Sequence, residues 1–283
     1  MRKGKFKPGT FLGLTLMHIV AIYAVWYGFA VGYSWKAWAC FVVLFLASSL
    51  GISVGYHRQF THHAFVCSNG VRKMLAAMGA LAWQGPIYKW VHNHLQHHAH
   101  PDQPGDIHSP IEYPGKIPGK LGVLKGLSWA HIRWIYHEVS IPPGYQPADV
   151  SKDEITIWQR RWYWLFVLSG FVIPYLICGW EGLLLGGFGR MVYAWHVTWS
   201  TNSICHVFGT PIEGASRNPL KPDNSRNNIW ICLLAWIGEN WHGNHHAKPN
   251  HPYLGRKWWQ LDLGSYLIVV LFWLKLAKNI RVA

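Results

Sequence analysis

The chain has 283 residues, of which 51% are hydrophobic and only 13% are charged. Because an average soluble domain is about 25% charged, this composition excludes a disordered chain and argues against an ordinary soluble protein. The net charge is +14 at pH 7, but the sequence has no basic run and no nucleic-acid-binding module. The charge therefore indicates a basic face towards anionic lipid and no nucleic-acid partner.

Four apolar segments are long enough to cross a bilayer, which takes about 20 residues per helix. Residues 10–33 and 37–56 contain no Asp, Glu, Lys or Arg, and neither do residues 162–180. The fourth segment covers residues 185–209, with Arg190 near its start. Basic residues mark the cytoplasmic side of a membrane protein. We therefore expect a single membrane domain over residues 1–283, with both termini and the segments 57–161 and 212–283 in the cytoplasm.

The 18 histidines are concentrated in three clusters, HRQFTHH, HNHLQHHAH and ENWHGNHH. Two clusters contain HxxHH, whose histidines share one face of a helix and can converge on one point. These are His94, His97 and His98 in the second cluster, and His242, His245 and His246 in the third. In the first cluster His57 and His62 lie five residues apart, roughly 140° around an α-helix. That spacing fits a frayed helix end and ligands to two different metal ions.

The type and number of these side chains favour a site with two metal ions. Imidazole binds zinc, copper, iron and nickel, and the HExxH helix of zinc proteases is absent. A pair of histidine-bound iron ions with open positions suits oxygen chemistry. In the fourth apolar segment Thr198, Asn202 and His206 share one helical face. Polar groups inside a span are usually functional, so we interpret His206 as a further ligand and Asn202 as a ligand or water holder, the alternative being a hydrogen bond between helices.

These motifs resemble those of the integral-membrane fatty-acid desaturases, most of all the stearoyl-CoA (Δ9) branch. The resemblance runs from about residue 40 to 255 and includes GYHRQFTHHAF, AWQGPIYKWVHNHLQHH, TWSTNSICHVFG and NNIWICLLAWIGENWHGNHHAKP. It implies an all-α membrane fold, with four transmembrane helices under a cytoplasmic helical cap. It also implies a cofactor of two iron ions that uses O2 and two electrons to place a cis double bond, at Δ9, in a saturated acyl chain.

The resemblance also assigns individual roles. Asn202 would hold a metal-bound water, and His63 would lie beside the ligands and orient them. The implied metal ligands are nine histidines: His57, His62, His94, His97, His98, His206, His242, His245 and His246.

The resemblance further implies a bent tunnel that holds one C–C bond of the substrate at the metal pair. The residues that match the bend are Gln84, Trp90, Thr198 and Trp199. Counting back along the second span from His57 places Phe45 and Phe41 at the far end of the tunnel. Bulky rings there favour a shorter acyl chain, of about 16 carbons, because a tunnel selects its substrate by shape.

The acyl carrier and the electron donor stay open at this stage. His92, Asn93 and Lys89 depart from the residues that contact the head group in the stearoyl-CoA branch. Acyl-CoA, acyl-carrier protein and lipid-bound chains therefore all fit. The sequence shows no fused cytochrome b5 domain, so we expect a separate donor on the basic face: a ferredoxin, a rubredoxin-like protein or cytochrome b5. These features favour the bacterial inner membrane over the endoplasmic reticulum.

Two alternative functions remain. A fatty-acyl or alkane hydroxylase would use the same scaffold and insert oxygen instead of removing a second hydrogen. A non-catalytic membrane metal-binding or transport protein would need polar residues across several spans, and the first three spans carry almost none.

Overall fold

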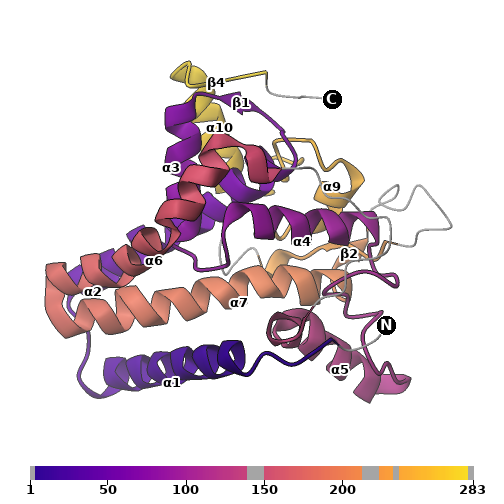
Figure 1. The fold of residues 1–283 in the computed structure, drawn as a ribbon, viewed down its shortest axis with the longest axis horizontal. Coiled ribbons are helices and arrows are strands. Elements are labelled where there is room, and N and C mark those ends of the chain that lie inside the picture. Colours follow the sequence, from indigo (N-terminus) through magenta and orange to yellow (C-terminus); the bar gives the residue numbers. More distant parts are fainter. Residues whose placement is uncertain (1–3, 139–149, 212–222, 232–235, 280–283) are drawn as a thin grey trace.

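A computed structural model describes residues 4–138, 150–211, 223–231 and 236–279 (Figure 1). Helices make up almost all of the regular structure there, as the sequence predicts. The named strands of the described residues are two residues long and form two antiparallel pairs. In one pair β1 (Val66–Cys67) lies beside β4 (Ala277–Lys278), and in the other β2 (Thr210–Pro211) lies beside β3 (Arg226–Asn227).

The first two apolar segments form two long helices. Helix α1 (Pro8–Ala30) has a proline at its start, where the missing N–H is not needed. Helix α2 (Trp35–Leu50) is capped by Ser34, whose hydroxyl accepts a hydrogen bond from the Ala37 N–H, and it continues as the π-helix η1 (Gly51–Thr61). Pro8–Ala30 and Trp35–Thr61 are both long and apolar enough to cross a membrane.

The third candidate span is a helical run of 53 residues, Glu154–His206. It comprises α6 (Glu154–Glu181), the π-helix η4 (Gly182–Gly189), α7 (Arg190–Ser203) and the short η5 (Ile204–His206). A straight helix of this length would measure about 80 Å, far more than a bilayer. The backbone leaves helical geometry at Cys178 and at Gly179, whose φ of +60° suits glycine, and α6 and α7 meet at this end of the molecule (Figure 1). The break thus falls at the end of the predicted third segment, and the fourth segment lies beyond it.

Arg190 joins the elements around that break. Its side chain is fully buried, and its guanidinium donates hydrogen bonds to the backbone carbonyls of Gly186, Leu81 and Gly170. Three carbonyl acceptors compensate part of the cost of burying the charge. The arginine that interrupts the fourth apolar segment therefore contacts protein and not lipid.

The remaining helices gather at the other end of the long helices (Figure 1). They are α3 (Asn69–Ala80), α4 (Ile87–Ala99), α5 (Gly119–His131), η2 (Arg133–Tyr136), η3 (Val150–Lys152), α9 (His242–Ala247) and α10 (Leu263–Trp273). The predicted cap also includes 139–149, 212–222, 232–235 and 280–283, which lie outside the described residues.

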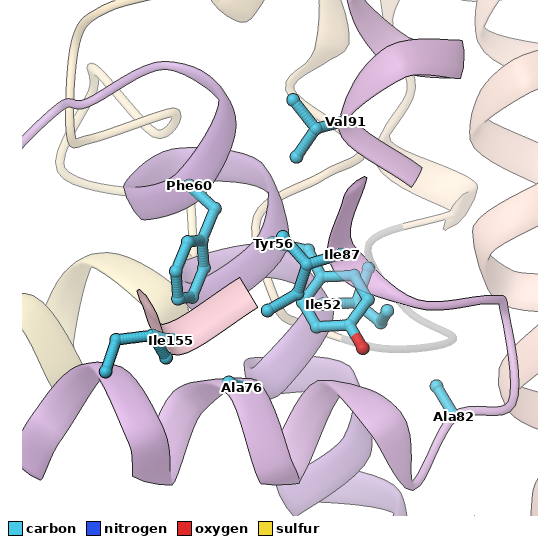
Figure 2. Packing of buried hydrophobic residues seen from close by; sticks show 8 residues of the cluster. All are labelled: Ile52, Tyr56, Phe60, Ala76, Ala82, Ile87, Val91 and Ile155. Atoms are coloured by element: carbon cyan, nitrogen blue, oxygen red, sulfur yellow. The ribbon is translucent and has the colours of Figure 1, made fainter. Parts of the chain in front are cut away.

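A buried apolar cluster fixes η1 against its neighbours (Figure 2). A side chain at Gly51 would overlap the backbone of Gly79, so η1 and α3 pack backbone to backbone. Burying each large side chain of the cluster contributes about 1.5–3 kcal/mol to the stability of the fold. The packing makes η1 and α4 a rigid support for the histidines that they carry. The cluster comprises Ile52, Tyr56, Phe60, Ala76, Ala82, Ile87, Val91 and Ile155.

Candidate metal centre

The structure gathers nine histidines into two adjacent groups. Within each group one ring nitrogen per residue lies within 4.8 Å of all the others. The first group holds His57, His62, His94, His98 and His245, and the second holds His97, His206, His242 and His246. These are the nine histidines that the resemblance implies as ligands.

The helices explain how the groups assemble. In α4, His94 and His98 are one turn apart and enter the first group, while His97 faces the second. The short helix α9 divides its histidines in the same way. The sequence analysis left room for His57 and His62 to bind two different metal ions, whereas the structure places both in the first group. Because η1 is a π-helix, in which the His62 N–H bonds to the His57 carbonyl over 3.1 Å, residues five apart share a face and both enter the first group.

Carboxylates stand behind four of the imidazole rings. The Nδ1–H groups of His97, His206 and His246 donate to Asp106, Asp102 and Asp223 over 2.9, 3.0 and 2.7 Å. Nδ1 of His57 lies 2.8 Å from a carboxylate oxygen of Glu239. Such carboxylates fix the tautomer and orientation of a metal-binding histidine and raise its basicity. Sequence reasoning missed the three aspartates. The signal that could have found two of them is the loop HPDQPGD directly after the second histidine cluster.

Burial and the neighbouring histidines shift the pKa values of these carboxyl groups in opposite directions. Burial raises the pKa of Asp102, but the charge and hydrogen bond of His206 outweigh it, so the pKa falls below its usual range. The pKa of Asp106 is lowered in the same way by His97, and that of Asp223 by His246. The carboxyl groups are therefore ionised at neutral pH and accept the ring protons.

Four histidine rings of the first group are held neutral by their surroundings. Burial, reinforced by neighbouring histidines, lowers the pKa of His62, His94, His98 and His245 well below the ordinary 6.5. The pKa of His242 in the second group is lowered for the same reasons. A neutral imidazole has a free lone pair, which is the form that binds a metal ion.

The ring nitrogens fit a bound cation better than they fit one another. Because the Nδ1 protons of His97 and His246 are donated to carboxylates, both Nε2 atoms are acceptors. These two Nε2 atoms nevertheless face each other at 3.3 Å. In the first group Nε2 of His98 lies 2.8 Å from Nε2 of His245 and 3.0 Å from that of His94. Buried imidazole nitrogens that converge this closely form a ligand set for a metal ion.

A cavity of about 60 Å³ adjoins both groups. Histidines of the first and second group line it, together with Asn202, Trp90 and Thr198. Its other walls include Ser49 and Ile52 of the second long helix. Its lining exposes mostly apolar surface, which suits an acyl chain. The structure thus places Asn202 at the cavity wall, beside histidines of both groups.

Three of the four residues assigned to the tunnel bend are joined by hydrogen bonds. The Gln84 amide donates to the Thr198 hydroxyl over 2.9 Å, and the Trp90 indole N–H donates to the Gln84 carbonyl over 3.4 Å. The Trp90 ring also stacks on His94, with 5.0 Å between ring centres. Trp199 is buried elsewhere, against Trp195 and His18, and is not a cavity-lining residue.

The remaining predicted site residues lie outside the cavity. Phe41 and Phe45 stack on each other, with 6.2 Å between ring centres, and both contact Tyr193 of α7. Phe45 lies one helical turn before Ser49, a cavity-lining residue, so the two rings continue the line of α2 away from the metal centre. His63 has an exposed side chain and belongs to neither histidine group.

Comparison with known proteins identifies the family. Residues 33–268 match the family described as fatty acid desaturase. This chain belongs to that family. The predicted family is thereby confirmed.

The desaturase is similar to several bacterial enzymes along most of its length. It is 37% identical to a hex-5-enoyl-[acyl-carrier protein] acetylenase of Moorena producens (strain JHB), over 92% of this chain and 78% of the relative. It is 32% identical to the sn-2 palmitoyl-lipid 9-desaturase of Nostoc sp. (strain 36), over 94% of this chain and 87% of the relative. It is 33% identical to the sn-1 stearoyl-lipid 9-desaturase of Anabaena variabilis, over 96% of this chain and 92% of the relative. The resemblance is thus to the acyl-lipid branch rather than to the stearoyl-CoA branch that the sequence analysis favoured.

Proposed function

We propose that this desaturase uses two iron ions, O2 and two electrons to place a cis double bond at Δ9 of a saturated, lipid-bound acyl chain. The observation that carries the proposal is the convergence of nine imidazole rings beside an apolar cavity. The bound iron pair would supply the oxidising power that removes hydrogen from an unactivated methylene. An all-histidine set with carboxylates behind it suits iron, although zinc also binds neutral imidazole.

In this proposal the chain's own residues hold the metal ions and orient the acyl chain. The nine histidines hold the two ions, and the carboxylates behind them keep the Nδ1 protons away from the cavity. Asn202 holds a metal-bound water at the cavity wall. Trp90 and Thr198 shape the bend, so that one C–C bond of the acyl chain lies nearest the ions. Because a methylene offers no hydrogen-bonding handle, shape and orientation alone select the bond.

We propose four transmembrane helices with both termini in the cytoplasm. The break at Cys178 and Gly179 supports dividing the run Glu154–His206 into a third and a fourth span. The basic segments next to the histidines favour placing that end of the molecule in the cytoplasm. The bacterial relatives favour the inner membrane as its location.

The relatives favour a lipid as the acyl carrier. Two of them are named for acyl chains at the sn-1 or sn-2 position of a lipid, and the acetylenase is named for an acyl-carrier protein. A lipid carrier would keep the acyl chain in the bilayer, beside the spans that lead to the cavity. The departures at Lys89, His92 and Asn93 from the stearoyl-CoA pattern agree with a head group other than CoA.

The test is expression in a bacterium whose fatty-acid profile is known, with double-bond positions determined by mass spectrometry of derivatised esters. We expect a new Δ9 monoene on extracted lipids, its absence in His97→Ala, and its persistence in the matched variant His100→Ala. A hydroxylated chain would overturn desaturation. A product found on acyl-carrier protein before it appears on lipid would overturn the lipid carrier. Iron and zinc content per purified chain identify the metal.

A further inference from the structure

Two tryptophans connect the protein surface to the metal centre on the side of α9. Trp241 directly precedes the ligand histidine His242 and is 1% exposed. Its ring lies 5.4 Å, centre to centre, from that of Trp259, in an edge-to-face arrangement. Trp259 is 44% exposed. Two indole rings in contact therefore connect solvent to a residue that binds the metal.

The segment that carries Trp259 is attached to the ligand helix itself. The Trp241 indole N–H donates to the Leu261 carbonyl over 2.8 Å. The Asn244 side-chain amide, from the middle of α9, donates to the Gln260 side-chain carbonyl over 3.1 Å, and the Arg256 guanidinium donates to the Asn244 backbone carbonyl. These bonds hold residues 256–261 against α9, so the distance from Trp259 to the metal centre is fixed.

The surface around Trp259 is basic. Lys248, Arg256 and Lys257 are exposed, and residues 248–261 contain no acidic side chain. The Lys257 ammonium lies 5.8 Å from the centre of the Trp259 ring. Asp262, the next acidic residue, is 2% exposed and is paired with Arg58. A basic rim around an exposed aromatic ring is complementary to an acidic protein surface.

A desaturase of the kind proposed above requires electrons from outside the molecule. Its metal-binding rings are buried or half-buried, so a large carrier protein cannot contact them directly. The rate of electron tunnelling falls steeply with the width of the gap. A docking position therefore works best where side chains in contact and held in fixed positions connect carrier and metal, as they do at Trp259.

We propose that Trp259 is the electron-entry point for a soluble, acidic one-electron carrier protein, and that the contact from Trp259 through Trp241 to His242 conducts the electron. This inference rests on the proposed function. In each transfer the reduced carrier loses one electron and one ferric ion of the pair becomes ferrous, and two transfers supply one turnover. The indole rings bridge the gap and are themselves neither oxidised nor reduced.

Docking is tested first, on the metal-free protein, so that the measurement is independent of activity. Reduced ferredoxin, rubredoxin and cytochrome b5 are each titrated against the wild-type chain, and the tightest binder is kept as the probe. We expect Lys257→Glu to raise its Kd about tenfold at low salt and much less at about 0.5 M salt, because screening weakens charge pairing. Lys125→Glu makes the same change on α5, which lies well away from α9 (Figure 1), and serves as the matched control.

Electron transfer is tested on the metal-loaded protein, with stopped-flow absorption following reduction of the metal. The quantity compared is the reduction rate with saturating carrier divided by the rate with dithionite, a small reductant that needs no docking surface. We expect Trp259→Leu to lower this ratio at least fivefold and Trp259→Phe, which keeps a ring, to restore part of it. Trp258→Leu is the control, since Trp258 is 94% exposed and adjacent in sequence.

Several results would overturn the entry point. One is that no carrier reduces the wild type faster than dithionite does. Another is that Trp259→Leu and Lys257→Glu behave like their controls. A third is that Trp259→Leu lowers thermal stability in lipid nanodiscs but not in detergent and leaves the ratio unchanged, which would make this segment a lipid-facing aromatic belt. If new double bonds still form in cells under any of these results, the proposed function stands and only the proposed electron path through Trp259 is wrong.

Discussion

The guanidinium of Arg58 and the carboxylate of Asp262 form a buried ion pair, with 2.9 Å between Nη2 and Oδ1. Both side chains are at most 2% exposed. Arg58 adjoins His57 in η1, and Asp262 caps α10 by accepting a hydrogen bond from the Ser265 N–H. The pair thus connects the second long helix to α10 across 204 residues.

We expect Asp262→Ala to lower the free energy of unfolding by about 3–5 kcal/mol, because it removes the nearer carboxylate from the buried Arg58 charge and leaves only that of Glu239, 3.7 Å away. Unfolding in mixed micelles, followed by circular dichroism, measures the change. The control is Glu112→Gln, which breaks the exposed pair of Glu112 with Lys116 and should cost less than about 1 kcal/mol. Equal losses in the two variants would show that the buried pair has no special role.

The carboxylate behind His97 leads to a second prediction. Asp106 is fully buried and also accepts hydrogen bonds from the N–H groups of Asp102 and His108. Asp106→Asn keeps the shape but removes the charge that makes His97 a stronger base. We expect the affinity for one of the two metal ions to fall about 10–100-fold. Metal content per chain after dialysis against a graded chelator should drop from two towards one, with Glu112→Gln unchanged. Two ions retained at the wild-type chelator concentration would contradict the assignment.

The histidine groups could be predicted largely from sequence, because HxxHH on one helical turn is a local pattern. The spacing of His94, His97 and His98 already implies convergence. The five-residue spacing of His57 and His62 could not be resolved in the same way, since it fits either a frayed α-helix or a π-helix, and only the packing of η1 against α3 distinguishes them. The sequence therefore left open whether these two ligands serve one ion or two.

The carboxylates behind the rings depend on contacts across the chain. Asp102 and His206 are 104 residues apart, and Asp223 and His246 are 23 apart, so no local pattern pairs them. The residues assigned to the tunnel bend likewise could not all be placed from local sequence patterns. Gln84 and Thr198 were matched by motif and do meet. Trp199, adjacent to Thr198, faces a different side of α7, because consecutive residues on a helix point about 100° apart.

The hydrogen bond between Gln84 and Thr198 leads to a third prediction, on regioselectivity. Thr198→Val keeps the volume of the side chain but removes the acceptor for the Gln84 amide. A hydrogen bond contributes about 0.5–1.5 kcal/mol, so we expect the ratio of the main double-bond position to its neighbours to fall about 2–10-fold. Mass spectrometry of derivatised esters gives the ratio. Thr15→Val, at an exposed site of α1, should leave it unchanged. An unaltered ratio in Thr198→Val would exclude this bond from substrate positioning.

A fourth prediction concerns acyl-chain length. If Phe45 closes the far end of the tunnel, Phe45→Leu opens space there. Its cost in stability is smaller than that of Phe45→Ala, which would be about 3–5 kcal/mol. We expect the ratio of 18-carbon to 16-carbon monoenes to rise severalfold, a free-energy change of about 1 kcal/mol from the space of one or two methylenes. Phe29→Leu changes a residue that is 90% exposed on α1 and is the control. An unchanged ratio would place the tunnel end elsewhere.

The stability of the metal-free protein should depend on pH in a direction that the histidines determine. Burial lowers the pKa of His94, His98 and His245 well below 6.5, so between that value and the folded-state pKa the unfolded chain binds more protons than the folded one. The contribution of these three rings to stability is therefore complete above about pH 6.5 and falls as the pH drops below it. Melting temperatures of the chelator-treated protein in detergent, measured from about pH 8 to 5, should decline in this window. Bound metal occupies the same lone pairs and should move the decline to lower pH. Melting temperatures that stay level or rise on acidification, or identical curves with and without metal, would contradict the neutral, metal-binding state of these rings.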